Sequence, residues 1–193
     1  MDYVNIALAF VLVAANGFFV ATEFALARLR PGQVTRWVSE GRPGAKSVQH
    51  GIDHIDAYLA ACQLGITISS LGLGALGEPA FHHILEPVFG EAATIAGVGI
   101  ASALSFGIIT MLHVVVGELA PKSLAISRTQ SIALFVAPVM RVFYAATKPL
   151  VDLFNGMGNL LLFPAVAEAR SGSPIACRPR LGGLLKYYHR PAA

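Results

Sequence analysis

The hydrophobic positions of this chain form long runs instead of the short periodic patterns of a water-soluble fold. Three runs stand out, at residues 4–27, 57–76 and 92–116. A helix needs about 20 apolar residues to cross a hydrocarbon core about 30 Å thick, and each run is long enough. The pattern predicts an all-α membrane protein with three transmembrane helices.

The segment after the third run is apolar overall, but proline and charged residues interrupt it. Two prolines and three charged residues divide residues 132–166: Pro138, Arg141, Lys148, Pro149 and Asp152. Short apolar pieces with charges between them are typical of helices that lie along the membrane interface. We expect juxtamembrane, interfacial helices over 132–166, with a fourth crossing as the alternative.

Two polar segments complete the chain. Residues 31–56 predict one or two cytoplasmic helices with a break around Gly41 and Gly44, the alternative being a solvated basic connector. Residues 169–193 show neither helical nor strand periodicity. We expect a membrane domain over 1–168 and a tail over 169–193 that is disordered or foreign to the domain.

The basic residues predict the orientation. Five lie between the first and second runs, none between the second and third, and nine after the third. Cytoplasmic loops carry an excess of Lys and Arg, so the first connection and everything after the third run are expected inside. This places the N-terminus outside, in a multi-pass protein of the inner (plasma) membrane. A fourth crossing would place the basic residues of the tail outside the cell, against this rule.

Composition narrows the function classes. The 193 residues are 55% hydrophobic and 13% charged, against about 25% charged in soluble domains, which excludes a soluble globular enzyme. The sequence has no Gly-x-Ser-x-Gly, His-Glu-x-x-His or P-loop motif, so we expect no enzymatic activity. Membrane orientation explains the net charge of +3, so nucleic acid is not expected as a partner. Cys62 and Cys177 are too few for a disulfide framework or a zinc site.

Two carboxylates are the first candidates for chemistry, because an ionisable group in hydrocarbon costs about 2.5–3.5 kcal/mol. Glu23 lies near the inner end of the first run and Glu118 just beyond the third. At about 1.5 Å per residue both come within about 10 Å of the inner interface, where they could share one cation. Alternatively each reaches the headgroups, or Glu118 pairs with Lys122 four residues on.

Backbone oxygens are expected beside Glu118. Pro121 lacks an amide hydrogen and clashes with the carbonyl of Gly117, which frees oxygens of the kind that hard cations bind. The alternative is an ordinary helix end at the interface.

Hydroxyl groups lie near the middle of the second run. Thr67, Ser69 and Ser70 either bind a cation or donate to the preceding turn. The pairs Gly65/Ser69 and Ser70/Gly74 have the small-xxx-small spacing that lets membrane helices approach closely.

Two further polar residues face the same region. Asn16 lies two turns before Glu23 on the same helix face, and His113 is either a proton relay, a metal ligand or a hydrogen-bonded structural residue. Carboxylate, hydroxyl, amide and carbonyl oxygens together suit Mg²⁺, Ca²⁺ or Na⁺.

Three segments of the sequence resemble one family. Residues 16–26, 63–80 and 113–123 contain the runs Asn-Gly-Phe-Phe, Gln-Leu-Gly-Ile-Thr and Gly-Glu-Leu-Ala-Pro-Lys. Together they resemble the transmembrane domain of the CNNM/CorC, or haemolysin C-like, family over about residues 1–165. The resemblance implies a homodimeric membrane domain of three spans that exports Mg²⁺, driven by Na⁺.

The resemblance also implies a set of ion-site residues. They are Thr22, Glu23, Thr67, Ser69, Ser70, Gly117 and Glu118. Val20 stands where many members carry a serine, and Ile66 and Thr67 where others carry asparagines, so some oxygen ligands are missing. Members usually continue into cytosolic CBS modules, which we do not expect within these 193 residues.

The expected function is secondary transport of a divalent cation, with Mg²⁺ as the favoured substrate. The expected partners are a second copy of the chain, the lipid bilayer and inorganic cations. The alternative is a non-transporting membrane module that anchors or regulates a partner, in which the polar residues serve only helix packing.

Overall fold

A computed structural model describes residues 2–89, 94–95, 98–162, 176–180 and 185–189. The chain divides into two compact units, Met1–Leu153 and Phe154–Ala193. Each unit is described by itself.

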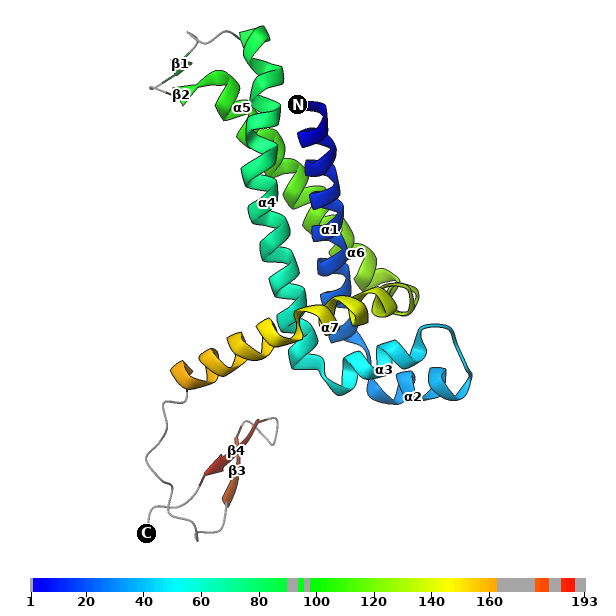
Figure 1. Cartoon of the computed structure of the whole chain (residues 1–193). Helices are drawn as coiled ribbons and strands as arrows, with labels where there is room; N and C mark the ends of the chain where they lie inside the picture. Colours follow the sequence, from blue (N-terminus) through cyan, green and yellow to red (C-terminus); the bar gives the residue numbers. More distant parts are fainter. Residues whose placement is uncertain (1, 90–93, 96–97, 163–175, 181–184, 190–193) are drawn as a thin grey trace. The chain divides into compact units, whose positions relative to one another are not determined.

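Three helical rods run side by side in the first unit (Figure 1). The first is α1 (Asp2–Arg28) and the second is α4 (Ile55–Phe89). The third is a continuous series of α5 (Ile100–Leu112), the π-helix η1 (His113–Leu119) and α6 (Ala120–Ser127). Large hydrophobic side chains are exposed along all three rods, as expected for helices surrounded by lipid.

Four helical segments are long and apolar enough to cross a membrane, within the residues that the structure describes. They are Val4–Arg28, Ile55–Leu85, Ser102–Ser127 and Thr129–Phe154. The multi-pass helical membrane architecture predicted from the sequence is therefore confirmed.

The predicted bounds of the third span, 92–116, are wrong. Strands β1 (Thr94–Ile95) and β2 (Val98–Gly99) form a short antiparallel pair, and the rod extends from Ile100 to Ser127. Hydropathy alone cannot distinguish a short apolar strand from the start of an apolar helix. Pro121 does not end the rod because it occupies the first turn of α6, where a missing amide hydrogen is tolerated.

The polar connector contains two helices, as predicted. They are α2 (Pro31–Ser39) and α3 (Ala45–Asp53), and the break between them holds Gly41 and Gly44. Both glycines have positive φ, +69° and +80°, a conformation that residues with a Cβ rarely adopt. The positions of these two glycines therefore fix where α2 ends and α3 begins.

The apolar segment after the third rod is one helix, α7 (Thr129–Leu162), not the several short helices predicted. Pro138 and Pro149 lie inside it and are both exposed. The buried residues Ala133, Ala137, Met140, Tyr144 and Val151 form one stripe at helical spacing. Packing of this stripe holds the helix through both prolines. Up to Leu153, α7 crosses the end of α1 and α4 instead of running along them (Figure 1).

Pro138 leaves one backbone carbonyl of α7 without its usual hydrogen bond within the helix. Pro138 has no amide hydrogen to donate to the carbonyl of Leu134, four residues earlier. That carbonyl oxygen lies directly against Gly44, so close that a Cβ at residue 44 would overlap it. The α2–α3 connection therefore packs against α7 at a carbonyl that the proline leaves free.

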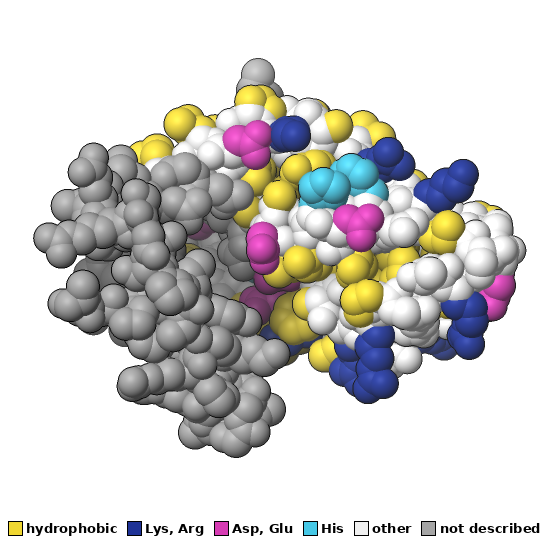
Figure 2. Space-filling model, turned by 90° about the horizontal axis from the view of Figure 1, so that it is seen from below, with side chains coloured by type: hydrophobic (Ala, Val, Ile, Leu, Met, Phe, Trp, Pro, Cys, Tyr) yellow, Lys and Arg dark blue, Asp and Glu magenta, His cyan; other side chains and the backbone are white. Residues whose placement is uncertain are grey.

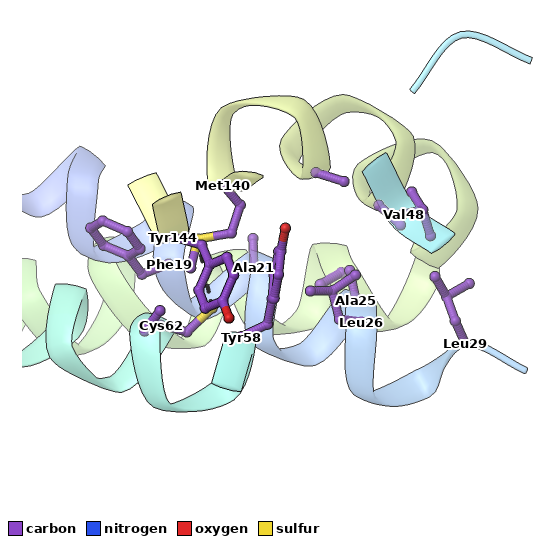
Figure 3. Close-up of a cluster of buried hydrophobic side chains, with 14 of the residues drawn as sticks. Phe19, Ala21, Ala25, Leu26, Leu29, Val48, Tyr58, Cys62, Met140 and Tyr144 are labelled. Atoms are coloured by element: carbon purple, nitrogen blue, oxygen red, sulfur yellow. Dashed lines mark hydrogen bonds between the residues drawn. The ribbon is translucent and has the colours of Figure 1, made fainter. Parts of the chain in front are cut away.

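Side chains from α1, α2, α3, α4, α6 and α7 form the main apolar cluster, part of which Figure 3 shows. The rings of Tyr58 and Tyr144 lie 4.6 Å apart, and Cys62 Sγ lies 4.0 Å from Met140 Sδ. A smaller cluster further along the rods contains Ala9, Val13, Leu73 and Ile109. Asn16 on α1 and the polar residues of 63–70 on α4 fall between the buried residues of the two clusters along the chain, whereas Thr22 and Glu23 lie among those of the main cluster.

The end of the first unit that carries α2, α3 and α7 displays many basic side chains (Figure 2). Lys and Arg occur at the end of α1, on α2, α3, α6 and α7, and between these helices. The described residues near the other end, 78–89, 94–95 and 98–107, contain none. This distribution is the one that the positive-inside rule associates with a cytoplasmic face.

In the second unit, β3 (Ala176–Arg180) pairs antiparallel with β4 (Leu185–His189). An irregular tail was predicted, and these ten residues differ from that prediction. The cross-strand pairs include Cys177 with Tyr188 and Arg178 with Tyr187, and tyrosine favours strands. The strands are too short and too mixed in polarity for an alternating pattern to reveal them. Residues 163–175, 181–184 and 190–193 of the segment lie outside the described residues.

Candidate functional site

A polar pocket of about 290 Å³ lies between the three rods. Helix α1 contributes four of its lining residues, α4 three, η1 two and α6 one. They are Asn16, Val20, Glu23, Phe24, Gln63, Ile66, Ser70, His113, Glu118 and Lys122. All three motif segments identified in the sequence therefore meet at one place.

Asn16 is a buried polar residue of the pocket wall, with 1% of its surface exposed. Its Nδ2 donates to the carbonyl oxygen of Gly117 at 2.9 Å, and its Oδ1 accepts from Ser70 Oγ at 3.3 Å. Ser70 Oγ also lies 3.1 Å from His113 Nε2. A hydroxyl has one hydrogen, so while Ser70 donates to Asn16 the imidazole Nε2–H donates to Ser70. This network joins the three rods through one buried and two half-buried polar side chains.

The π-helix η1 places His113 and Glu118 in the same pocket. In an α-helix, residues five apart are about 140° apart around the axis. In a π-helix the backbone hydrogen bonds link residues five apart, so two residues at that spacing lie near each other on the same face of the helix. The irregular backbone predicted next to Glu118 is thus present, and the carbonyl of Gly117 is available to a side chain of another helix.

Two glycines allow α1 to approach this irregular turn. A Cβ at Gly17 would lie 2.9 Å from Pro121 Cγ. A Cβ at Gly117 would lie 3.2 Å from both Asn16 Nδ2 and His113 Cδ2. Small residues at such contacts let membrane helices pack backbone to backbone.

The two carboxylates of the pocket have no cationic partner. Glu23 Oε1 accepts from Gln63 Nε2 at 3.4 Å, and Glu118 is exposed at the pocket. The described residues form two ion pairs, both of which involve Glu40 at the end of α2. The Glu118–Lys122 pair considered from the sequence is absent, because Lys122 Nζ lies over the Phe24 ring, 4.4 Å from its centroid. The pocket thus holds two carboxylates, neither of which forms an ion pair with the one lysine among its lining residues.

The structure brings together four of the seven predicted site residues. Glu23, Ser70 and Glu118 line the pocket, and Gly117 faces Asn16 through its carbonyl. Ser69 is buried but is not among the lining residues.

The two threonines bond within their own helices. Thr22 is fully buried and donates to the carbonyl of Phe18 at 2.7 Å, while the exposed Thr67 donates to that of Gln63 at 2.8 Å. For both hydroxyls the structure shows the back-bonding alternative. The part of the chain that the structure describes contains no cluster of three His, Cys, Asp or Glu side chains placed to hold a metal. A cation here would rely on two carboxylates, neutral oxygens and water.

Five of the lining residues were not predicted as ion ligands: Val20, Phe24, Gln63, Ile66 and Lys122. Gln63 was detectable, because it is the only strongly polar residue of the run 57–76. The sequence indicated the spacing of Lys122 to Glu118, but not its contact with Phe24, since that contact depends on how α1 packs against α6.

Comparison with known proteins assigns the family. The sequence matches the family model of the Cyclin M transmembrane N-terminal domain, CNNM, over residues 7–176. This chain belongs to the CNNM family. The family resemblance found in the sequence is thereby confirmed.

The CNNM domain is similar to several Bacillus subtilis (strain 168) proteins. It is 43% identical to UPF0053 protein YhdT over 153 residues, which cover 78% of this chain and 33% of YhdT. It is 41% identical to UPF0053 protein YhdP over 163 residues, covering 83% of this chain and 37% of YhdP. The chain thus spans about a third of the length of these relatives, and their names state no substrate.

Proposed function

We propose that this CNNM domain transports a divalent cation, with Mg²⁺ as substrate, export as the direction and Na⁺ as the coupling ion. The observation that supports it is the pocket among three membrane helices, where Glu23 and Glu118 meet neutral oxygens and neither carboxylate forms an ion pair within the described residues. Two unpaired carboxylates at membrane depth are costly, and a cation would relieve that cost.

The chemistry of the lining suits a hard, partly hydrated ion. Mg²⁺ prefers oxygen ligands, commonly binds through one or two carboxylates and keeps several waters. Glu23 and Glu118 would supply charge, and Ser70 and Gln63 neutral oxygens. A water occupies about 30 Å³ of liquid volume, so a pocket of about 290 Å³ has room for several waters around one ion.

In this proposal the three rods cross the plasma membrane with the N-terminus outside, and α7 lies along the inner interface. Arg141 and Lys148, seven residues apart, share one exposed face of α7. The exposed Val139 and Leu150 lie on the opposite face, as in a helix between headgroups and acyl chains. Two such chains would assemble as the homodimer that the family resemblance implies.

Transport measured in proteoliposomes tests the proposal. We expect Glu118→Gln to abolish Mg²⁺ efflux, because the charge that attracts the ion is lost while the size of the side chain is kept. Glu78→Gln, on α4 and outside the pocket lining, is the matched control and should retain flux. Equal thermal midpoints would show that both variants fold. Full flux in the Glu118 variant would refute the pocket as the transport site.

A second candidate function is a non-transporting module that anchors or regulates a partner. The internal bonding of Thr22, Thr67 and Asn16 favours it, because polar groups that are satisfied within the protein also serve helix packing. Isothermal titration in detergent separates the two functions. A packing module gives no saturable heat with MgCl₂ or NaCl, whereas a transporter does.

A further inference from the structure

Lys122 is the only Lys or Arg among the described residues of the pocket wall, and it pairs with neither carboxylate. It shares the wall with Glu23 and Glu118, yet neither of the ion pairs within the described ranges includes it. Its Nζ lies 4.4 Å from the centroid of the Phe24 ring instead. The ammonium group is therefore placed by an aromatic face while two carboxylates line the same pocket.

Glu118 is the carboxylate nearest to Lys122 along the chain. It precedes Lys122 by four residues, the spacing at which Glu and Lys commonly pair on an α-helix, and α6 begins two residues after it. The lysine stem is long and flexible, so its charge can move between partners while the backbone stays in place. A phenylalanine ring attracts a cation through its face, and this attraction is stronger where water is scarce.

We propose that Lys122 is a built-in competitor for the metal, and that Phe24 controls this competition by holding the ammonium off the carboxylates. This inference rests on the proposed function and adds a regulation of the same pocket. With Lys122 on Phe24, the pocket carries two free negative groups and accepts a cation. With Lys122 on Glu118, that carboxylate is neutralised and the metal is excluded.

The competition sets the apparent affinity of the pocket for Mg²⁺. When one of two states binds, the apparent affinity falls in proportion to the fraction of molecules in that state. Phe24 raises the fraction whose carboxylates are free. The alternative position also gives the empty pocket a counterion after the metal leaves, which lowers the cost of charges left at membrane depth.

A double-mutant cycle on the purified chain tests the inference, with MgCl₂ titrated calorimetrically. Phe24→Leu keeps an apolar side chain but removes the aromatic face, and Phe24→Tyr, the matched control, keeps the face. We expect Phe24→Leu to raise the Kd for Mg²⁺ about two- to fivefold, the range a cation–π contact supports, and Phe24→Tyr to leave it near the wild-type value. Lys122→Met should lower the Kd, because the competitor is gone.

The decisive comparison is Phe24→Leu in the Lys122→Met background, where we expect no effect on the Kd. An equal effect in both backgrounds would mean that Phe24 acts by packing, and this would overturn the inference. So would a Phe24→Leu variant with a lower thermal midpoint but an unchanged Kd, since the contact would then only tie α1 to α6.

The same titrations distinguish this inference from the proposed function. Saturable Mg²⁺ binding that Glu118→Gln removes, together with no effect of Phe24→Leu, overturns the competition alone. Binding that is absent in the wild type, or unchanged in Glu118→Gln, overturns both.

Discussion

Asn16 shows how much of the candidate site depends on one short side chain. Its amide donates to a backbone carbonyl 101 residues away and accepts from Ser70, so it connects all three rods. Hydrogen bonds between membrane helices contribute about 0.6–2 kcal/mol each. The sequence indicated the face on which Asn16 lies, from its spacing to Glu23. Pro121 indicated a free carbonyl at Gly117, but the sequence could not show that Asn16 donates to it, because that contact depends on how α1 packs against η1.

His50 gives a prediction at the same scale, outside the membrane-spanning rods. Its Nδ1 lies 3.0 Å from the Tyr58 hydroxyl, and its ring stacks on His54 at 4.5 Å. Burial lowers the pKa of His50 below 6.5, and the positive charges of His54 and Arg141 lower it further, while Asp53 opposes them. The folded state therefore holds this imidazole neutral at a pH where the unfolded chain binds a proton.

Stability should accordingly fall as the pH decreases below 6.5, because the unfolded state then takes up more protons than the folded state. Thermal midpoints recorded from pH 8 to pH 5 measure this. In His50→Gln, which keeps a polar side chain without a titrating group, the decline should be shallower. Identical declines in the two proteins would assign the pH dependence to other groups.

At the scale of elements, the sequence predicted what local signals specify. Proline and glycine gave the bounds of α2 and α3, and hydropathy gave α1 and most of α4. It failed where the answer depends on tertiary contacts. Pro138 looked like a helix end, but burial of Met140 and Tyr144 against α4 keeps α7 continuous. Pro121 indicated irregular backbone near Glu118, but not a π-helix over His113–Leu119, whose Gly117 packs against α1.

The contact between α1 and α4 yields a prediction with an internal control. A Cβ at Gly65 would lie 2.6 Å from atoms of the Phe19 ring, whereas a Cβ at Gly74 meets nothing within 4 Å. Gly65→Ala should therefore destabilise the fold by about 1–3 kcal/mol through overpacking. Gly74→Ala should be neutral or stabilising by up to about 1 kcal/mol, since alanine favours a helix.

Thermal unfolding of the two alanine variants in the same detergent measures the difference. If both variants have the same midpoint as the wild type, Phe19 moves without cost and close approach at Gly65 does not hold the helices together. The same small-xxx-small spacing marks both glycines in the sequence, as Gly65/Ser69 and Ser70/Gly74, so only the structure separates them.

At the scale of the whole molecule, the distribution of basic residues supports the proposed orientation. The first unit carries its described Lys and Arg residues toward the end that holds α2, α3 and α7, as the sequence predicted (Figure 2). Length and composition leave the number of crossings open, because α7 also qualifies as a span. Its crosswise course over the end of α1 and α4 favours three crossings.

Cys177 reports directly on this topology. With three crossings, residue 177 lies inside the cell, so a membrane-impermeant maleimide should label it only after permeabilisation. The test uses a Cys62→Ala background, which leaves one cysteine in the chain. Four crossings would place it outside and allow labelling of intact cells. Ile84→Cys, exposed on α4 near the other end, is the positive control in a cysteine-free background and should react in intact cells.

The π-helix has a consequence for how mutations along the third rod are interpreted. A helical wheel drawn through Ile100–Ser127 with a single α-helical repeat assigns His113 and Glu118 to different sides, although both line one pocket. The periodicity of tolerated and harmful substitutions should therefore change phase within His113–Leu119, with separate wheels needed before and after it.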